Sequence, residues 1–219
     1  MVDSSPMYGR AESVVGTCLA TLDARSRAFV ATKVWTRGRQ AGIDEMRRSL
    51  QLLGTPQLDL MQIHNLLDWR THIETLRAWK AEGLIRYIGV THYTASAHDE
   101  LAAVLRTTPV DFVQINYSLE EPESAREILP LAMDRGIAVI VNRPFGGGEL
   151  VRRLREQPVP AWAADYGCER WSQLLLKYVL AHAAVTTVIP GTGNPMHMAE
   201  DCAAGSGPAI DVDRLRRIV

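Results

Sequence analysis

The chain has 219 residues, of which 47% are hydrophobic and 22% are charged, and its formal net charge is -1. This composition is typical of a globular domain with a full core, and the length suits one domain rather than two. Lys and Arg are scattered among Asp and Glu, which excludes the basic stripe of a nucleic-acid-binding protein and the charged face that binds an anionic membrane. We therefore expect a small-molecule partner. A monomer or weak homo-oligomer is also expected.

The cysteines and the first residues indicate a cytoplasmic protein. Cys18, Cys168 and Cys202 are odd in number and have no paired spacing, which predicts reduced thiols and no metal site. The first residues lack a basic region followed by an apolar stretch. No later segment approaches the roughly 18 apolar residues that cross a bilayer, so we expect neither export nor membrane insertion.

Short apolar runs alternate with longer stretches of helical period along the chain. The predicted strands are residues 28–32, 58–63, 85–90, 110–115, 137–141 and 185–189. The predicted helices are residues 11–24, 43–53, 72–82, 96–105, 124–135 and 171–182. Gly54, Gly83 and Gly136 each follow a helical stretch, where a residue that tolerates positive φ ends the helix. The pattern is that of a repeated βα unit.

The predicted strands are apolar on both faces, which indicates a parallel sheet buried between layers of helices. Counting residues 1–3 as the stub of a further strand gives about seven strands. We predict an α/β fold of the TIM type, an (α/β)8 barrel that lacks its first strand and helix. No Gly-x-Gly-x-x-Gly turn follows an early strand, which disfavours a doubly wound sheet. Residues 1–219 are expected to form a single barrel-like domain, incomplete at the N-terminus.

Four polar residues stand where apolar runs end, namely Asp3, Tyr8, Lys33 and His64. In a barrel of parallel strands these ends meet at one rim, where barrel enzymes place their catalytic groups. Taken alone, a Lys or His at a strand end is more often an ordinary solvated or hydrogen-bonded residue. The four residues together predict a catalytic site.

These residue types suit the protonation of a carbonyl oxygen during its reduction. A tyrosine titrates near pH 10, but a positive charge at about 4 Å contributes roughly 4 kcal/mol at an effective dielectric of about 20. Lys33 is expected to lower the pKa of Tyr8 and make it a useful acid, while Asp3 compensates the charge of Lys33. His64 would donate a hydrogen bond that orients and polarises the carbonyl.

Several short motifs resemble those of the aldo-keto reductase family. They are residues 3–9 (Asp-Ser-Ser-Pro-Met-Tyr-Gly) with Glu12 beyond them, 32–33 (Thr-Lys), 62–64 (Gln-Ile-His), 83–90 (Gly-Leu-Ile-Arg-Tyr-Ile-Gly-Val), 114–117 (Gln-Ile-Asn-Tyr) and 189–192 (Ile-Pro-Gly-Thr). The resemblance implies an (α/β)8 barrel in which a nicotinamide cofactor, usually NADPH, passes hydride to an aldehyde or ketone. It also implies that Tyr8 is the proton donor, that Lys33 and Asp3 adjust the acidity of Tyr8, and that His64 orients the carbonyl.

The same resemblance implies a set of cofactor contacts. The candidates are Thr91, His92, Gln114, Asn142, Arg143, Gly191, Thr192, Gly193, Asn194, His197, Glu200 and Asp201. Arg143 matches a residue that stacks on the nicotinamide ring, and a guanidinium plane suits that role. Asn194 is expected to cap a helix that begins at Pro195, which leaves backbone N–H groups for an anion.

The chain departs from the family pattern at the cofactor phosphate. Many relatives read the 2′-phosphate with a Lys and an Arg, where this chain has Gly191 and His197. NADP(H) is still expected over NAD(H). Trp35 and Trp69 closely follow Lys33 and His64 and are expected to wall the substrate pocket.

Three functions are compatible with these residues. The first is an NAD(P)-dependent reductase of aldehydes or ketones. The second is a weakly active or inactive protein that binds the nicotinamide cofactor in a regulatory role. The third is an aldolase-type barrel in which Lys33 forms a Schiff base, and the neighbouring Tyr8 and Asp3 disfavour it.

Overall fold

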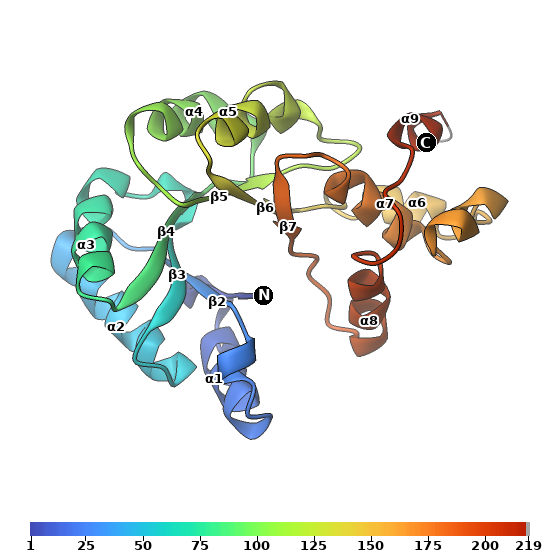
Figure 1. Ribbon diagram of the computed structural model, residues 1–219. Helices are drawn as coiled ribbons and strands as arrows, with labels where there is room; N and C mark the ends of the chain where they lie inside the picture. The colour runs from blue at the N-terminus through green and yellow to red at the C-terminus, as the bar shows by residue number, and fades with distance from the viewer. Residues whose placement is uncertain (218–219) are drawn as a thin grey trace. The chain divides into compact units, whose positions relative to one another are not determined.

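Strands and helices alternate along the chain in the computed structural model, which describes residues 1–217 (Figure 1). The strands in that part of the chain are β1 (Val2–Asp3), β2 (Val30–Val34), β3 (Leu58–Ile63), β4 (Ile85–Thr91), β5 (Phe112–Asn116), β6 (Ala138–Asn142) and β7 (Val185–Val188). They form one sheet of seven strands whose order follows the chain. The pairs β1–β2, β2–β3, β3–β4 and β6–β7 are parallel. The α/β fold with about seven strands, one fewer than a complete barrel, is confirmed.

Helices connect these strands. The α-helices of the described chain are α1 (Ala11–Thr21), α2 (Arg39–Leu53), α3 (Trp69–Ala81), α4 (His98–Thr107), α5 (Ile128–Asp134), α6 (Glu149–Leu154), α7 (Trp171–Leu180), α8 (Pro195–Ala203) and α9 (Val212–Arg216). The short 3-10 helices are η1 (Pro6–Tyr8), η2 (Arg25–Arg27), η3 (His64–Leu66), η4 (Ala95–Ala97), η5 (Glu123–Arg126) and η6 (Ala161–Tyr166). Gly54 ends α2 in the left-handed conformation, with φ of 64°, as its place in the sequence predicted.

The described residues divide into two compact units. Unit 1 comprises Met1–His92 and Pro109–Val113, and unit 2 comprises Tyr93–Thr108 and the chain from Gln114 onward. In unit 1, every residue of β2 and β3 is buried. Helix α2 packs against α1, α3 and β2, and α3 packs against β3 and β4 (Figure 1). A strand that is buried on both faces explains the continuous apolar runs in the sequence.

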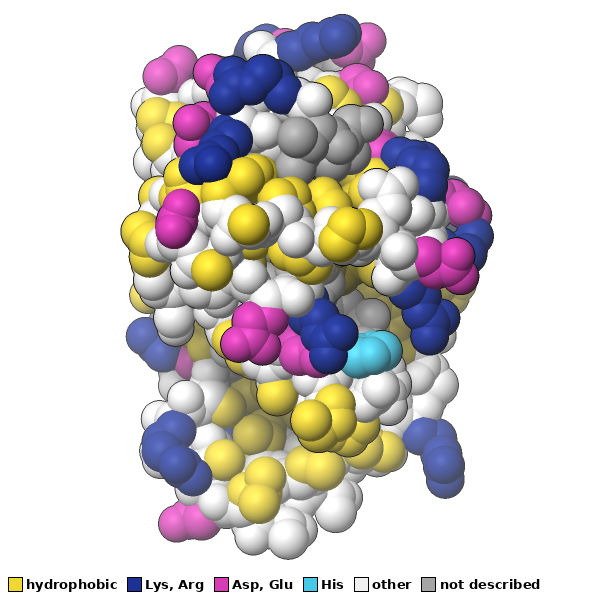
Figure 2. Space-filling view, turned by 90° about the vertical axis from the view of Figure 1, so that its right-hand side faces the viewer, with side chains coloured by type: hydrophobic (Ala, Val, Ile, Leu, Met, Phe, Trp, Pro, Cys, Tyr) yellow, Lys and Arg dark blue, Asp and Glu magenta, His cyan; other side chains and the backbone are white. Residues whose placement is uncertain are grey.

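In unit 2, α7 packs against β7 and α8, and α5 packs against β6 and α4. The ammonium of the buried Lys177 on α7 donates to the carbonyls of Ser206, at 2.6 Å, and Pro208, at 3.2 Å. This anchors the segment that leads to α9. On the face drawn in Figure 2, Lys and Arg side chains lie among Asp and Glu side chains and hydrophobic groups. Within residues 1–217, no helix combines the length and hydropathy of a membrane span.

Several element boundaries differ from the sequence prediction, and two of these differences have identifiable reasons. Strand β2 runs to Val34 and so includes Lys33, because an ion pair with Asp3 from β1 lets the ammonium stay inside the strand. The helix predicted over residues 124–135 is broken into η5 and α5 at Glu127, which has φ of −138°. Pro130 would clash with the carbonyl four residues earlier in a continuous helix, whereas it is tolerated in the first turn of α5. Helices α6 and α9 were not predicted.

Candidate active site

Lys33 lies at the centre of the polar cluster of unit 1. It pairs in register with Gln62 of β3, and its side chain is fully buried. The Nζ atom donates to Asp3 Oδ2 at 2.5 Å and to the Ser4 carbonyl at 2.8 Å. Burial lowers the pKa of Lys33, and the carboxylates of Asp3 and Glu12 oppose that shift. With its amine held by two acceptors inside the sheet, Lys33 is badly placed to form a Schiff base.

Asp3 receives hydrogen bonds on both of its carboxylate oxygens. Lys33 donates to Oδ2, and Gln62 Nε2 donates to Oδ1 at 2.8 Å. The Asp3 side chain is only 5% exposed, although the residue stands near the chain start. This role of Gln62 was not predicted from the sequence. Its signal was present, because an amide inside the fully buried run of β3 must find a hydrogen-bond partner.

Tyr8 ends the short helix η1, and 47% of its surface is exposed. The ammonium of Lys33 lies 5.1 Å from the centroid of the Tyr8 ring. Burial of the phenol is the main cause of a raised pKa of Tyr8, and the negative charge of Asp3 raises it further. The predicted lowering of this pKa is therefore wrong for the protein without a bound ligand.

His64 follows β3 directly and is buried. Its ring centroid lies 6.1 Å from that of Tyr8, edge to face, and 6.2 Å from that of Trp35. Burial lowers the pKa of His64 to about 4, and the charges of Lys33 and His92 add to the effect. The imidazole is therefore neutral at physiological pH and can donate a hydrogen bond without carrying charge. Its Nδ1 atom lies 3.2 Å from the hydroxyl oxygen of Ser5.

The two tryptophans predicted for the substrate pocket differ in their surroundings. Trp35 is 42% exposed and lies beside His64, while its backbone N–H donates to Glu45 Oε2 at 2.5 Å. Trp69 begins α3, and the Arg70 guanidinium lies 4.6 Å from its ring. In the described chain, no hydrogen bond or ring contact joins Trp69 to Tyr8 or His64. Trp35 is thus the tryptophan that the structure brings to the cluster.

Thr91 and His92 belong to unit 1 as well. Thr91 is the last residue of β4, and its hydroxyl accepts a hydrogen bond of 3.0 Å from the backbone of Asn65. Asn65 has a positive φ of 52° and immediately follows His64. Thr91 therefore steadies the turn that carries His64. His92 acts on His64 through its charge.

The other cofactor candidates lie in unit 2. Gln114 in β5 is buried, and Asn142 ends β6. Arg143 follows with a positive φ of 48°, and its Nη2 atom lies 3.6 Å from Glu121 Oε1. The Arg143 side chain is 41% exposed, which leaves its guanidinium face accessible for stacking on a planar ring.

The segment before α8 has the predicted cap. Asn194 Oδ1 accepts from the Met196 backbone at 2.9 Å, Pro195 stands at the first helical position, and Thr192 Oγ1 accepts from the Asn194 backbone. Gly191 and Gly193 border open space, since a Cβ added to either would meet no atom within 4 Å. Backbone N–H groups before an exposed first turn suit an anionic group such as a phosphate.

Glu200 and Asp201, near the end of α8, contact neighbouring residues, unlike the mostly exposed loop of residues 191–193. Glu200 Oε1 lies 3.5 Å from Nε of Arg170, and the Glu200 carbonyl accepts a hydrogen bond from Gln173. Asp201 is buried, which raises its pKa against the effect of a hydrogen bond from Ser172. His197, in contrast, is exposed on α8. Glu200 and Asp201 thus attach α8 to its neighbours.

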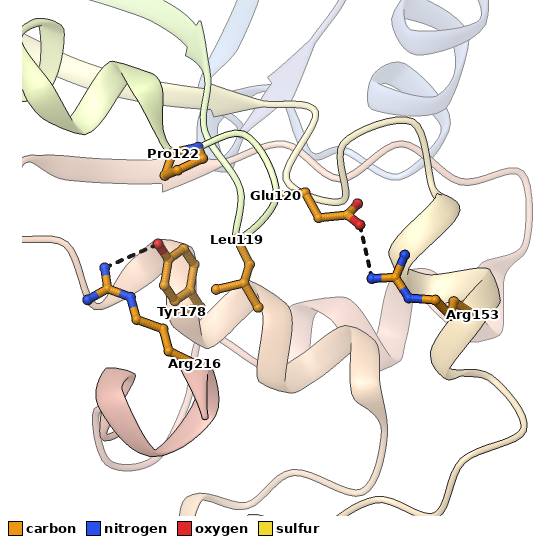
Figure 3. A pocket seen from close by; sticks show the side chains of 6 residues that line it. All are labelled: Leu119, Glu120, Pro122, Arg153, Tyr178 and Arg216. Atoms are coloured by element: carbon orange, nitrogen blue, oxygen red, sulfur yellow. Dashed lines mark hydrogen bonds and ion pairs between the residues drawn. The ribbon is translucent and has the colours of Figure 1, made fainter. Parts of the chain in front are cut away.

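A cavity of about 520 Å³ in unit 2 is lined by residues that the sequence analysis did not select (Figure 3). They are Leu119, Glu120, Pro122, Arg153, Tyr178 and Arg216. Arg153 donates to Glu120 at 3.1 Å, and Arg216 donates to the Tyr178 hydroxyl at 3.4 Å. Both guanidinium groups that line the cavity thus already have partners. Within residues 1–217, no three His, Cys, Asp or Glu side chains gather as a metal-binding group.

Comparison with known proteins places these motifs in a family. A model described as "Aldo/keto reductase family" matches residues 1–218. The chain is 27% identical over 172 residues to the aldo-keto reductase YhdN of Bacillus subtilis, a match that covers 72% of this chain and 51% of YhdN. It thus spans about half the length of that relative. The NADH-specific methylglyoxal reductase of Escherichia coli is 25% identical, over 97% of this chain and 80% of that protein.

A solved structure shows the same fold. The aldo/keto reductase from Klebsiella pneumoniae, determined in complex with NADP and acetate, has a TM-score of 0.80 to this chain and 26% identity. The superposition covers 98% of this chain and 77% of that one. The prediction of family and fold from short motifs is confirmed.

Proposed function

Because the chain belongs to the aldo/keto reductase family, we propose that it reduces an aldehyde or ketone to the alcohol with an NAD(P)H cofactor. The observation that carries this proposal is the cluster of Asp3, Lys33, Tyr8 and His64 within unit 1. An ammonium bound to a carboxylate lies under a phenol ring, and a neutral imidazole lies beside the same ring.

Tyr8 is the proposed proton donor. Its raised pKa keeps the phenol protonated at neutral pH, so the proton is present when a carbonyl arrives. As the carbonyl oxygen gains negative charge, the nearby ammonium of Lys33 favours transfer of that proton. Asp3 holds Lys33 in place and keeps it charged against the effect of burial.

His64 is the proposed orienting group. As a neutral donor it can direct a carbonyl oxygen toward Tyr8, and the ring of Trp35 offers an apolar wall next to it. Such a hydrogen bond strengthens as the oxygen becomes negative, so it favours the transition state over the bound substrate. The proposed substrate is thus a small molecule with an accessible C=O group.

A reduced nicotinamide, when bound, supplies the hydride for this reaction. One observation in unit 2 suits the phosphate groups of this cofactor. The loop of residues 191–193, which contains two glycines, leads into the capped and exposed first turn of α8. Asn142, Arg143, Gln114, Thr91 and His92 stay candidates for contacts with the nicotinamide end.

NADP(H) is favoured over NAD(H) in the proposal. Relatives differ on this point, since the Klebsiella enzyme is described with NADP and the Escherichia coli enzyme as NADH-specific. Gly191 and His197 stand where a Lys and an Arg would give a stronger preference. Cytoplasmic location, a monomeric or weakly oligomeric state and a single domain stay predictions.

The test compares the wild type with Tyr8→Phe in an assay of aldehyde-dependent NADPH oxidation. Removing the hydroxyl should lower kcat by about 10²- to 10⁴-fold, because the general acid is lost. The NADPH dissociation constant, from a fluorescence titration, should not change. Tyr166→Phe is the matched control, since that hydroxyl in η6 lies outside the cluster. Equal turnover by Tyr8→Phe and wild type would refute the proposed chemistry.

A second candidate is a regulatory protein that binds the cofactor without turning it over. The raised pKa of Tyr8 favours this alternative, since it makes the phenol a weaker acid. Titrations with NADPH and NADH, paired with assays on several aldehydes and ketones, separate the two functions. Tight cofactor binding without any carbonyl-dependent oxidation would support the regulatory role.

A further inference from the structure

Ser5 links the helix that carries Tyr8 to the ring of His64. It is fully buried, and its hydroxyl makes two polar contacts. Its Oγ atom accepts a hydrogen bond of 3.4 Å from the Met7 backbone, which caps η1, and lies 3.2 Å from Nδ1 of His64. No role was assigned to Ser5 from the sequence.

The Ser5 hydroxyl has one proton, and its placement decides the hydrogen-bond pattern. The Met7 N–H can only donate, so Ser5 uses a lone pair there. Within the described chain, Nδ1 of His64 is the one acceptor within hydrogen-bond distance of the Ser5 hydroxyl. A donation from Ser5 to Nδ1 therefore satisfies both groups.

The opposite tautomer, with the proton on Nδ1 of His64, would leave a hydrogen-bonding group unsatisfied. If Nδ1 carried the proton and donated to Ser5, the hydroxyl proton would be buried without an acceptor, which is unfavourable. The ring would also turn the bare lone pair of Nε2 toward any carbonyl oxygen, and two acceptors repel. In residues 1–217, Nε2 of His64 has no hydrogen-bond partner, so it stays available to a ligand.

We propose that Ser5 is a positioning residue, which donates to Nδ1 of His64 and thereby holds the imidazole in the Nε2–H form that can donate to a carbonyl. The catalytic meaning of this inference rests on the proposed function, whereas the tautomer itself does not. The low pKa of His64 agrees with it, because the ring stays neutral and a tautomer is defined. Lys33, Tyr8 and His92 are the titratable groups that face the ring.

The first test is a ¹⁵N NMR spectrum of the histidine-labelled wild-type protein near pH 7. The chain has six histidines, and His64→Gln identifies the signals of His64 by their loss. We expect Nε2 to carry the proton, and Nδ1 to show the shift of an unprotonated nitrogen that accepts a hydrogen bond. In Ser5→Ala, the Nδ1 resonance should move to the position of an unbonded nitrogen. A protonated Nδ1 in the wild type, or an unchanged Nδ1 resonance in Ser5→Ala, would overturn the inference.

The second test is kinetic. In Ser5→Ala, kcat for aldehyde reduction should fall by roughly two- to tenfold, the range for one neutral hydrogen bond, with unchanged NADPH binding. Ser5→Thr, which keeps the hydroxyl, should recover both the NMR shift and the rate. Ser49→Ala is the control for loss of a buried hydroxyl, because Ser49 on α2 has no hydrogen-bond partner within the described residues. A wild type without turnover would count against the proposed function alone, since the NMR test needs no activity.

Discussion

Lys33 and Asp3 form an ion pair that unit 1 buries almost completely, with side-chain exposures of 0% and 5%. Removing two charges from water is expensive, and a direct contact offsets that cost only when further hydrogen bonds complete the site. The Ser4 carbonyl and the Gln62 amide supply those bonds. The pair is therefore stable as a unit, and each charge depends on the other.

We predict that Lys33→Met destabilises the protein by about 3–5 kcal/mol, because Asp3 is left buried without its counter-charge. The double variant Lys33→Met/Asp3→Asn should be more stable than the single variant, since it removes both charges. Urea unfolding measures the three proteins. The surface pair Arg77–Glu74 provides a control, as Arg77→Met should cost at most about 1 kcal/mol. A double variant as unstable as Lys33→Met would show that the buried charge is not the cause.

His64 makes the stability of the protein sensitive to acid. Its folded pKa of about 4 lies below the ordinary value of 6.5, so the unfolded chain binds the proton first as the pH falls. Stability should decrease between pH 6.5 and about 4, by on the order of 1–3 kcal/mol from this group. Unfolding measured across that range should show a shallower decline for His64→Gln than for the wild type. Parallel curves would contradict the lowered pKa.

At the scale of elements, the sequence predicted most strands and helices but not the contacts between distant ones. Strand β3 matches its predicted range of 58–63, because its apolar run is continuous and local. Strand β2 was ended too early, because a lysine normally stops a buried run and the carboxylate that accommodates it comes from β1. The roles of Gln62 and Ser5 were missed for the same reason: their partners lie 59 residues away.

Helices α1 and α2 approach each other closely at Gly16. A Cβ at this position would lie 2.3 Å from the carbonyl oxygen of Leu52. Replacement of a helical glycine by alanine ordinarily gains up to about 1 kcal/mol. We predict the opposite sign here, a loss of about 1–3 kcal/mol, because backbone must move to admit the methyl group.

Thermal unfolding of Gly16→Ala tests this prediction. Gly147→Ala serves as the control, since a Cβ there meets its nearest atom at 3.9 Å and the backbone has no positive φ. A Gly16→Ala variant that is as stable as the wild type would mean that α1 and α2 are not packed as tightly as the structure indicates.

For the whole molecule, the alternation of apolar and helical stretches was enough to predict the fold, and the strands follow one another in the sheet as expected. The four proposed catalytic residues could be selected from the sequence because they stand at or near the ends of β1, β2 and β3 or in the short helix η1. They are Asp3, Tyr8, Lys33 and His64. The direction of the Tyr8 pKa could not be predicted from the same residues. It depends first on how far the phenol is buried and then on the charge of Asp3, and both are set only by the folded structure.

The most direct test of the proposed chemistry follows deuterium from the cofactor to the product. The protein is mixed with an aldehyde and NADPH that carries deuterium in place of both hydrogens at C4 of the nicotinamide, and the product is analysed by mass spectrometry. We predict an alcohol labelled at the former carbonyl carbon with the wild type, and at most a trace with Tyr8→Phe. An unlabelled product, no alcohol from the wild type with any aldehyde or ketone, or equal labelled alcohol from both proteins would contradict the account.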